Sequence, residues 1–476
     1  MPPYRSITRE VDEAPAGPRI AAFFDLDRTI LAGFSALAMM ARWTMAGRVS
    51  AGGLARTALA SLQFGLGRLD FSALVAESSA LLAGVAESDY AGMGQSLFSG
   101  WLAGDVFPES RALVRAHQRR GHAVAVVSAA TRYQVEPVSR DLGIADIMCT
   151  ELEIHDGLFT GNVKRPTCYG EGKARAARSF ARERGIDLEQ SYFYTDSDED
   201  LALLNIVGRP RPINPTRRLA SIAAKRGWPT RVFTSRGAPR AADLVRTSLA
   251  LGSLAPSLAF GLPVAALDGQ WRSAMNVAAS MWGELGTALA GINVHVTGEE
   301  HLWSRRPAVF VFNHQSAIEV LLLCKLLRRD FVGISKQEIR RYPLLGQAFA
   351  LAGTVFIDRF DHGKAASALE PAVEALRQGL SIAIAPEGTR SPTPRLGRFK
   401  KGAFHLAMEA GVPVVPIVFR NSLDALPKYR AVVRPAVVEV VVHPPIDTGD
   451  WRRETIDEHI AAVRRLYLET LDGDGV

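Results

Sequence analysis

The chain has 476 residues, of which 47% are hydrophobic and 22% are charged. This composition supports packed cores and argues against disorder for the bulk of the chain, and the length predicts two or three domains. Lysine and arginine number 56 against 49 acids, which gives a formal net charge of +7. That excess favours an anionic partner, such as a phosphorylated substrate, an acidic lipid surface or a nucleic acid, without choosing among them.

The three cysteines, Cys149, Cys168 and Cys324, stand outside any CxxC pair and away from histidines at metal-ligand spacing. They indicate a reducing compartment and no structural zinc. Residues 1–17 contain acids and prolines but no apolar core, so they do not form a signal peptide. We expect them to be a disordered leader.

Short apolar runs that end in polar residues predict strands. The N-terminal half has such runs at residues 20–24, 123–127 and 191–195. The C-terminal half has them at residues 308–312, 331–334, 354–357, 381–385, 414–419 and 436–442. Stretches rich in Ala, Leu and Arg separate the runs and are typical of helices. The pattern therefore predicts two separate α/β modules.

The first run leads into Asp25 and Asp27, in the sequence Phe-Asp-Leu-Asp-Arg-Thr. Two carboxylates at positions i and i+2 leave a strand on the same side. Ser128 ends the second strand, Lys173 opens a helix, and an acidic cluster at 196–200 follows the third strand. Together they predict a nucleophile, a carboxylate metal site suited to Mg²⁺, and a hydroxyl and an ammonium group that hold phosphate.

These four elements, in this order, resemble the haloacid dehalogenase superfamily, in the subgroup that includes phosphoserine phosphatases. The resemblance covers about residues 18–230 and implies a Rossmann-like domain with a helical cap at about 31–105. It implies that Asp25 forms an aspartyl-phosphate and that Asp27 protonates the leaving group. The implied ligands are Ser128 and Lys173 for the phosphoryl oxygens, and Asp25, the Asp27 carbonyl and Asp196 for Mg²⁺, with Asp200 in support.

One residue departs from the commonest form of the first motif, which has Gly where this chain has Arg28. Some family members carry Arg there, so phosphatase activity remains the expectation, with a non-catalytic regulatory module as the alternative. The cap sequence is apolar and rich in small residues, which suggests a lipid phosphate as substrate. A small soluble phosphomonoester is the competing hypothesis, because helix packing within the cap explains the same composition.

Between the modules, residues 209–246 are rich in Lys and Arg, and residues 247–267 contain no charge. The uncharged run is about long enough to span a bilayer, but its Pro and Gly residues break a simple spanning helix. A second uncharged stretch follows at residues 273–283. We interpret residues 231–284 as a basic linker and a helical hairpin set into an anionic membrane surface. A hairpin buried in a soluble domain is the alternative.

In the second module, His314 follows a strand and Glu319 lies five residues later, in an apolar helix. The carboxylate can turn back, accept the imidazole N–H and fix its tautomer, which leaves the other ring nitrogen as a general base. A hydroxyl deprotonated by His314 would attack a thioester directly. Within the sequence, no Ser or Cys stands in a G-x-S-x-G setting.

Further basic residues follow the other strands of this module. Arg359 and Arg390 can each bind a phosphate bidentately. Arg390 belongs to the segment Pro-Glu-Gly-Thr-Arg at 386–390, and a proline-rich strand begins near residue 412. Additional capacity for anions comes from Lys336, Arg398, Lys400 and Lys401.

This ordered set resembles the glycerolipid acyltransferase family, which contains the 1-acylglycerol-3-phosphate acyltransferases. The resemblance covers about residues 285–445 of a domain that we place at 285–476. It implies His314 as the base, acyl-CoA as the donor and a lysophospholipid as the acceptor. The family normally has Asp where this chain has Glu319, which is one methylene longer and can make the same hydrogen bond. The implied acceptor-phosphate site comprises Arg359, Glu387, Gly388, Thr389 and Arg390, joined by Lys336.

The two resemblances together predict acylation of lysophosphatidic acid to phosphatidic acid, fused to a Mg²⁺-dependent phosphomonoester hydrolase. The expected location is the cytoplasmic face of the cell membrane. Another lysophospholipid or glycerol-3-phosphate is the alternative acceptor. Nucleic-acid binding is not expected, because the basic linker has few aromatic residues, Trp228 and Phe233, between its cations.

Overall fold

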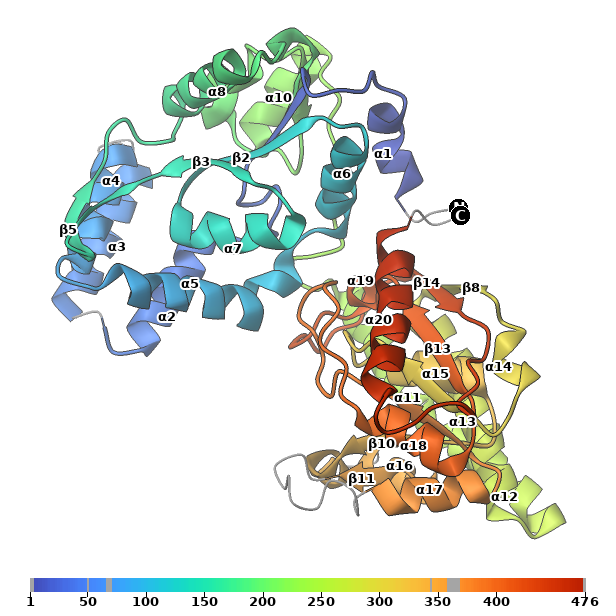
Figure 1. Cartoon of the computed structure of the whole chain (residues 1–476). Helices are drawn as coiled ribbons and strands as arrows, with labels where there is room; N and C mark the ends of the chain where they lie inside the picture. Colours follow the sequence, from blue (N-terminus) through green and yellow to red (C-terminus); the bar gives the residue numbers. More distant parts are fainter. Residues whose placement is uncertain (1–3, 49–50, 66–70, 343–344, 358–368, 474–476) are drawn as a thin grey trace. The chain divides into compact units, whose positions relative to one another are not determined.

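The computed structural model describes residues 4–48, 51–65, 71–342, 345–357 and 369–473. The chain divides into two compact units, 1–238 and 239–476 (Figure 1). Each unit is built on its own sheet of mostly parallel strands. The prediction of two α/β modules is therefore confirmed.

The first unit contains a five-stranded sheet in the order β3-β2-β1-β6-β7, and all of its strand pairs are parallel. The three strands predicted for this unit are all present and occupy the centre, as β2, β1 and β6. The flanking strands β3 and β7 were not predicted. The bounds are β1 (Ala21–Phe24), β2 (Ala123–Thr131), β3 (Asp146–Thr150), β6 (Tyr192–Thr195) and β7 (Arg209–Pro212).

Both faces of this sheet are buried, because successive strand residues point to opposite faces. Along β1, Ala22 and Phe24 pack into one core, while Ala21 and Phe23 pack into the other. The first core also takes residues from α1 (Arg5–Asp12), α6 (Pro108–Arg119) and α7 (Arg132–Leu142). The second takes them from α8 (Glu171–Arg184), α9 (Leu201–Leu204) and α10 (Arg217–Arg226).

The cap of the first unit comes from two inserts. The longer one, between β1 and β2, contains α2 (Ser35–Met45), α3 (Ala51–Gly65), α4 (Phe71–Ser79), η1 (Ala80–Leu82), α5 (Glu87–Gly100) and η2 (Leu102–Asp105). The second insert is an antiparallel hairpin of β4 (Leu152–His155) and β5 (Leu158–Val163). Phe159 joins the inserts, since its backbone hydrogen-bonds to those of Gly84 and Val85.

The expectation of a disordered leader at residues 1–17 is wrong for its central part, which forms helix α1. Val11 is 1% exposed and packs in the first core. The carboxylate of Glu10 pairs with the guanidinium of Arg211 in β7. A short amphipathic helix is stable here because its apolar face is buried against the sheet and α6, which a reading of composition alone does not reveal.

The second unit contains a seven-stranded sheet in the order β11-β10-β12-β9-β13-β14-β8. The pair β13–β14 is antiparallel and the other pairs are parallel. All six predicted strands are present, and β8 was not predicted. The bounds are β8 (Ile292–Thr297), β9 (Val309–Phe312), β10 (Phe331–Lys336), β11 (Val355–Ile357), β12 (Ser381–Ile384), β13 (Val414–Phe419) and β14 (Ala436–Val442).

Helices cover both faces of this sheet. Phe310 and Phe312 of β9 pack with α11 (Ala241–Gly252), α12 (Leu254–Asp268), α13 (Trp271–Ala290) and α15 (Glu319–Leu327). Val309 and Val311 pack on the opposite face with α17 (Glu370–Arg377), α18 (Gly402–Ala410) and α20 (Ile456–Asp472). Shorter helical segments are η3 (Leu188–Gln190) and η4 (Asp198–Asp200) in the first unit, and α14 (His301–Ser304), η5 (Gln337–Arg341), α16 (Leu345–Leu351) and α19 (Ser422–Ala425) in the second.

The expected basic linker is largely absorbed into the two units. Phe233 packs in the core of the first unit, and the hydroxyl of Ser235 donates a hydrogen bond to Glu109. Helix α11 already belongs to the second unit, where the buried carboxylate of Asp243 lies 2.5 Å from the guanidinium of Arg434. One end of the expected linker is therefore held by contacts within the first unit, and the other end by contacts within the second.

The predicted helical hairpin is present as α11 and α12 followed by α13. Gly261 lies so close to α13 that a Cβ there would meet the carbonyl oxygen of Ala274 at 2.3 Å. Residues Ala241–Asp268 form a 28-residue helical run that is long and apolar enough to cross a membrane, and 28% of its most apolar window is buried. Its exposed apolar side chains include Leu249, Leu251, Phe260, Leu262 and Leu267.

Two candidate active sites

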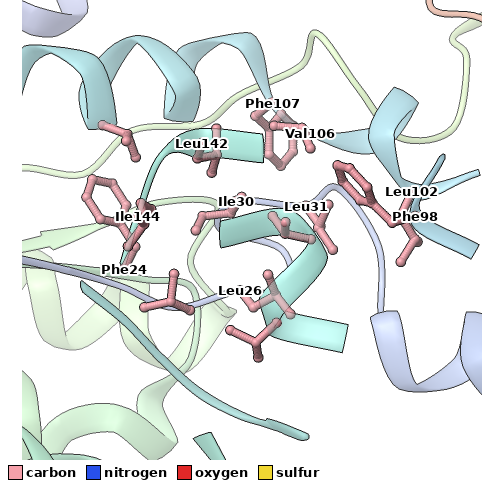
Figure 2. Packing of buried hydrophobic residues seen from close by; sticks show 14 of the residues in the cluster. Phe24, Leu26, Ile30, Leu31, Phe98, Leu102, Val106, Phe107, Leu142 and Ile144 are labelled. Carbon is pink, nitrogen blue, oxygen red and sulfur yellow. The ribbon is translucent and has the colours of Figure 1, made fainter. Parts of the chain in front are cut away.

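The first candidate site lies at the carboxyl edge of the first sheet. Asp25 and Asp27 follow β1, Ser128 lies within β2, and Asp196 follows β6. Because these three strands are neighbours and parallel, their carboxyl ends meet at one edge. Leu26, between the two aspartates, is fully buried and packs in the first core (Figure 2). Burial of Leu26 fixes the backbone that carries both carboxylates.

Lys173, at the start of α8, completes this site. Its ammonium group lies 3.0 Å from Oδ1 of Asp25 and 2.9 Å from Oδ2 of Asp200. The hydroxyl of Thr195 donates a hydrogen bond to the same Asp200 oxygen at 2.5 Å. All four residues are buried. Lys173 thus holds the expected nucleophile and the supporting acid together.

The other predicted residues have distinct partners. Oδ1 of Asp27 accepts a hydrogen bond from the backbone N–H of Ser35, the first residue of α2. The hydroxyl of Ser128 accepts one from the N–H of Ala130. Ser128 is 2% exposed. Asp27 is therefore tied to the entrance of the cap, and Ser128 keeps a hydroxyl proton to donate to a phosphoryl oxygen.

Burial dominates the electrostatics of this site. Desolvation, reinforced by Asp200 and Asp196, raises the pKa of Asp25 to about 7 although Lys173 opposes the shift. Burial likewise raises the pKa of Asp27 to about 6 and that of Asp196 to about 6. Burial alone would lower the pKa of Lys173, but Asp200 and Asp25 raise it. The site therefore keeps an excess of carboxylates that a further cation would stabilise.

Arg28 takes a backbone conformation that explains the preference for glycine at this position. Its φ is +57°, in the left-handed region that residues other than glycine rarely adopt. Its backbone carbonyl accepts a hydrogen bond from the side-chain amide of Asn214. Its guanidinium lies 3.1 Å from Oδ2 of Asp196. The departure from the commonest motif thus places an additional cation at the site.

The donor atoms suit Mg²⁺. Within the described ranges, no three acidic, imidazole or thiol side chains converge as a complete metal cage. Mg²⁺ is often held by one or two carboxylates with waters and substrate phosphate, and it does not need such a cage. Asp25 and Asp196, with the main-chain carbonyl of Asp27, supply hard oxygen donors of this kind. Burial raises the pKa of Asp25 and of Asp196, and a divalent cation bound to them would favour their ionised forms.

The second candidate site lies at the carboxyl end of β9. Nδ1 of His314 lies 2.6 Å from Oε2 of Glu319. The other carboxylate oxygen, Oε1, accepts hydrogen bonds from the N–H groups of Gln315 and Ser316 and from the hydroxyl of Ser422. The Glu319 side chain is fully buried, whereas that of His314 is 22% exposed. The carboxylate therefore has all its partners inside the protein and presents the imidazole to solvent.

Glu387 joins the histidine loop to the Pro-Glu-Gly-Thr-Arg segment. Its carboxylate accepts hydrogen bonds from the N–H groups of His314 and Gly397, each at 2.7 Å. Burial raises the pKa of Glu387, although these two donors oppose the shift. Glu387, which was predicted to help form the acceptor-phosphate site, thus uses both of its oxygens to position two loops of that segment. Ser391 adds a third link, since its N–H donates to the carbonyl of His314.

An open basic cleft begins at these loops. Its volume is about 1070 Å³, and its walls include Thr389 and Arg390 together with residues of α20. Gly388, with φ at +75°, packs against the Lys400 side chain. Lys336 is exposed at the end of β10 and does not line this cleft. Arg359 lies outside the described residues.

An apolar cavity of about 130 Å³ was not predicted from the sequence. It lies between α13, α15 and β10, and Phe312 forms part of its wall. The Phe312 ring lies edge-on to the His314 imidazole, with centroids 5.8 Å apart. No motif marks this cavity, because ordinary core residues contributed by distant segments form it.

Comparison with known proteins finds a family match for each unit. Residues 22–205 match the family of haloacid dehalogenase-like hydrolases, and residues 293–420 match the acyltransferase family. A 1-acyl-sn-glycerol-3-phosphate acyltransferase of Limnanthes alba is 36% identical over 184 residues, which are 38% of this chain and 65% of that protein. A probable phosphatase of Mycobacterium tuberculosis is 37% identical over 220 residues, which are 45% of this chain and 76% of that protein.

A solved structure, the 1-acyl-sn-glycerophosphate acyltransferase of Thermotoga maritima, is 25% identical with a TM-score of 0.43, covering 48% of this chain and 95% of that chain. The chain spans just under two thirds of the length of the plant acyltransferases it matches. It spans 76% of the mycobacterial phosphatase. The chain therefore belongs to the haloacid dehalogenase-like hydrolase family through its first unit and carries an acyltransferase-family domain in its second.

Proposed function

We propose that the second unit transfers an acyl group from acyl-CoA to lysophosphatidic acid, which yields phosphatidic acid and CoA. The observation that carries this proposal is the His314–Glu319 pair, on a loop whose backbone is hydrogen-bonded to Glu387 and Ser391 in the wall of a basic cleft. An ionised Glu319 can only accept, so Nδ1 of His314 carries the proton between them. The other ring nitrogen, Nε2, then has a free lone pair and can act as a base.

The reaction follows from this arrangement in two proton transfers. Nε2 of His314 takes the proton of the acceptor hydroxyl as the oxygen attacks the thioester carbonyl. The tetrahedral intermediate collapses, the carbon–sulfur bond breaks, and the imidazolium returns its proton to the leaving thiolate. Glu319 stabilises the imidazolium in between. No covalent acyl-enzyme forms, and the cation of Arg390 is available to bind the acceptor's phosphate.

The test uses the full chain with labelled lysophosphatidic acid and acyl-CoA in detergent or vesicles. Labelled phosphatidic acid and one equivalent of free CoA are the expected products. Parallel reactions with glycerol-3-phosphate and with a lysophospholipid that lacks a phosphomonoester measure acceptor choice. Transfer to either of these in place of lysophosphatidic acid would replace the proposed acceptor, and transfer to none would reject the acyltransferase activity.

We further propose that the first unit hydrolyses a phosphomonoester with Mg²⁺, and the buried Asp25–Lys173–Asp200 set supports this. When bound, Mg²⁺ would screen the charge of the phosphoryl group. Asp25 attacks phosphorus, Asp27 protonates the departing oxygen, and Lys173 and Ser128 bind the phosphoryl oxygens. Water then attacks the aspartyl-phosphate while Asp27 takes its proton, which releases inorganic phosphate and restores both carboxyl groups. The raised pKa of Asp27 suits a group that must carry a proton near neutral pH.

The substrate test measures phosphate release from lysophosphatidic acid, phosphatidic acid and phosphoserine, with Asp25→Asn as the blank. Release from the lipid phosphates is the expected result. Release from phosphoserine alone would reject a lipid substrate. Release from none of the three, with Mg²⁺ present, would favour a regulatory role for this unit.

We also propose that the hairpin docks on the cytoplasmic face of a membrane. Exposed apolar side chains on α12 support this, among them Phe260 at 62% and Leu267 at 88% exposure. Free cysteines are consistent with the cytoplasmic side. The expected result is co-sedimentation with anionic vesicles that Phe260→Ser with Leu267→Ser abolishes. Leu158→Ser, at an exposed site in the first unit, is the matched control. Unchanged sedimentation of the double variant would contradict the proposal.

A further inference from the structure

The basic cleft of the second unit holds many more cations than one acceptor phosphate requires. Its acids are Glu387, whose oxygens are both used by backbone donors, and Asp457, which pairs with Lys401 at 2.7 Å. The ion pairs of the described residues include neither Arg390, Arg398 nor Lys400. The lining cations are Arg390, Arg398, Lys400, Lys401, Lys428 and Arg464.

These cations fall into two groups by what holds them. Arg390 and Lys400 form an inner pair. Arg390 directly precedes Ser391, whose N–H donates a hydrogen bond to the His314 carbonyl. The backbone carbonyl of Arg390 accepts a hydrogen bond from the Lys428 ammonium group. The Lys400 ammonium lies 3.0 Å from where a Cβ on Gly388 would stand. The inner pair is therefore fixed beside the histidine loop.

Arg398, Lys401 and Arg464 form an outer cluster attached to helix α20. Arg464 donates hydrogen bonds to the carbonyls of Leu396 and Gly397, which precede Arg398 in the chain. Lys401 is held by Asp457, in the first turn of the same helix. The cluster is thus held by a helix. That helix is separate in sequence from His314 and from the Pro-Glu-Gly-Thr-Arg segment.

The two substrates of the proposed reaction place their phosphates at different distances from the reacting atoms. In lysophosphatidic acid, only the glycerol carbons separate the acceptor hydroxyl from the phosphate, so that phosphate lies near His314. In acyl-CoA, the pantetheine arm separates the thioester from the nucleotide phosphates, so those phosphates bind far from the base. The inner pair adjoins the segment whose Ser391 N–H is bonded to the His314 carbonyl, so it suits the first anion. The outer cluster is tied to α20 and suits the second.

We infer that Arg398, Lys401 and Arg464 form the binding site for the phosphorylated nucleotide of the acyl donor. This inference rests on the proposed acyl transfer and deepens it. Arg398 and Lys401 contact the phosphate groups, while Arg464 positions the loop and contributes positive charge. Each charge-assisted contact strengthens binding only for donors that carry the nucleotide. The cluster thereby selects nucleotide-linked thioesters over shorter ones.

The experiment crosses truncated donors with variants of the full chain. Initial rates are measured with acyl-CoA, its 3′-dephospho form and the acyl-pantetheine thioester. The variant is Arg398→Ala with Lys401→Ala, and Arg465→Ala is the control because Arg465 is exposed on the same helix and does not line the cleft. The expected result is a rise in KM for acyl-CoA of about ten-fold or more in the variant. KM values for acyl-pantetheine and for lysophosphatidic acid stay at their wild-type levels.

Inhibition by a nucleotide fragment, together with the pattern of KM changes, separates this inference from the proposed function and from a folding defect. Adenosine 3′,5′-bisphosphate should inhibit the wild type competitively against acyl-CoA and lose that effect in the double variant. A rise in KM for lysophosphatidic acid alone would reassign the cluster to the acceptor and overturn the inference. An equal loss with all donors, acyl-pantetheine included, would also overturn it. Absence of transfer from every donor by the wild type would reject the acyltransferase proposal itself.

Discussion

At the carboxyl edge of the first sheet, the cations are already engaged. Lys173 lies between Asp25 and Asp200, and Arg28 contacts Asp196. At the corresponding edge of the second sheet, the carboxylates are the engaged groups. Glu319 has four donors and Glu387 has two, while cations such as Arg390 face an open cleft without an acidic partner among the described residues.

This difference indicates how each site meets a phosphate. The first site is a closed set of buried charges with an excess of carboxylate, so the proposed Mg²⁺ would offset the repulsion between these carboxylates and a phosphoryl dianion. The second site uses its acids to hold loops and one imidazole, and its cations remain available for large anionic substrates. Preorganisation therefore lies in ion pairs in the first unit and in the backbone hydrogen bonds of two glutamates in the second.

Loss of the base should have the largest effect and should be confined to one site. His314→Ala should lower acyl transfer by at least about 10²-fold, the usual contribution of a positioned general base. Phosphate release by the first unit should stay at the wild-type rate, since its site lies in a separate unit. Both activities are measured on the same preparation. His295→Ala, at an exposed position on β8, is the control.

Near wild-type acyl transfer by His314→Ala would reject His314 as the base. A parallel loss of phosphatase activity would show that the two sites are coupled and do not act independently. Either conclusion requires that His314→Ala has the same unfolding midpoint as the wild type.

Changes at Glu319 should have smaller but graded effects. Glu319→Asp shortens the side chain by one methylene, so the carboxylate cannot keep both the His314 contact and the three donors at Oε1. We expect a fall in kcat of about ten-fold, the value of one hydrogen bond to a charged group. Glu319→Gln should lose more activity. Its amide N–H₂ would face either the His314 N–H or the three donors at the Oε1 position, and the neutral amide cannot stabilise the imidazolium.

The measurement is kcat together with the unfolding midpoint of each variant. Equal kcat values for the Gln and Asp variants would show that the charge of Glu319 is not needed. Full activity of Glu319→Asp would show that the three donors at Oε1 have no positioning role.

The motif residues of both sites could be predicted because they follow predicted strands. The carboxyl ends of parallel strands meet at one edge of a sheet. Every predicted strand is present, and the parallel sheet of the first unit brings Asp25, Ser128 and Asp196 to one edge, as that of the second unit brings His314 beside Glu387 and Ser391. The contact of His314 with Glu319 also follows from spacing, since five residues allow the carboxylate to return to the ring.

Other features depended on contacts that no local pattern carries. The role of Glu387 is set by the N–H of Gly397, ten residues later in an irregular loop. Helix α1 is stabilised by Arg211, about 200 residues away. The strands missed by the prediction, such as Arg209–Pro212, have polar or proline-rich sequences whose pairing is decided by the neighbouring strand. Long-range packing overrides local propensity at these positions.

The first site should show a metal dependence linked to pH. Asp25 and Asp196 have raised pKa values, about 7 and about 6, so the metal-free folded state binds more protons than the unfolded state between about pH 4 and those values. Their contribution to stability therefore falls as pH rises through this window. Mg²⁺ binds the deprotonated carboxylates, so its stabilisation of the first unit should be small near pH 5.5 and larger near pH 8, by a few degrees in midpoint.

The measurement is the unfolding midpoint with and without Mg²⁺ at each pH. His117 and His122 titrate with the opposite sign, because burial lowers the pKa of each and favours the neutral form. Their contribution is lost as pH falls below about 6.5, with or without metal, so it cancels in the difference. Asp25→Asn should reduce the Mg²⁺ effect, and an effect that is independent of pH would contradict carboxylate ligation.

Arg28 should give the smallest effect and the sharpest test of charge balance in the first site. Arg28→Gly removes the guanidinium 3.1 Å from Asp196 and relieves a left-handed backbone that costs about 1 kcal/mol for a side chain. Glycine gains a comparable freedom in the unfolded chain, so the net change in stability should be small. Mg²⁺ affinity should rise several-fold, because one competitor for the Asp196 carboxylate and one repelling charge are gone.

The affinity is measured by titration calorimetry without substrate. Arg218→Ala, which removes an exposed cation that pairs with nearby Asp198, is the matched control and should leave the affinity unchanged. Weaker Mg²⁺ binding by Arg28→Gly would mean that Arg28 orients Asp196 for the metal instead of competing with it.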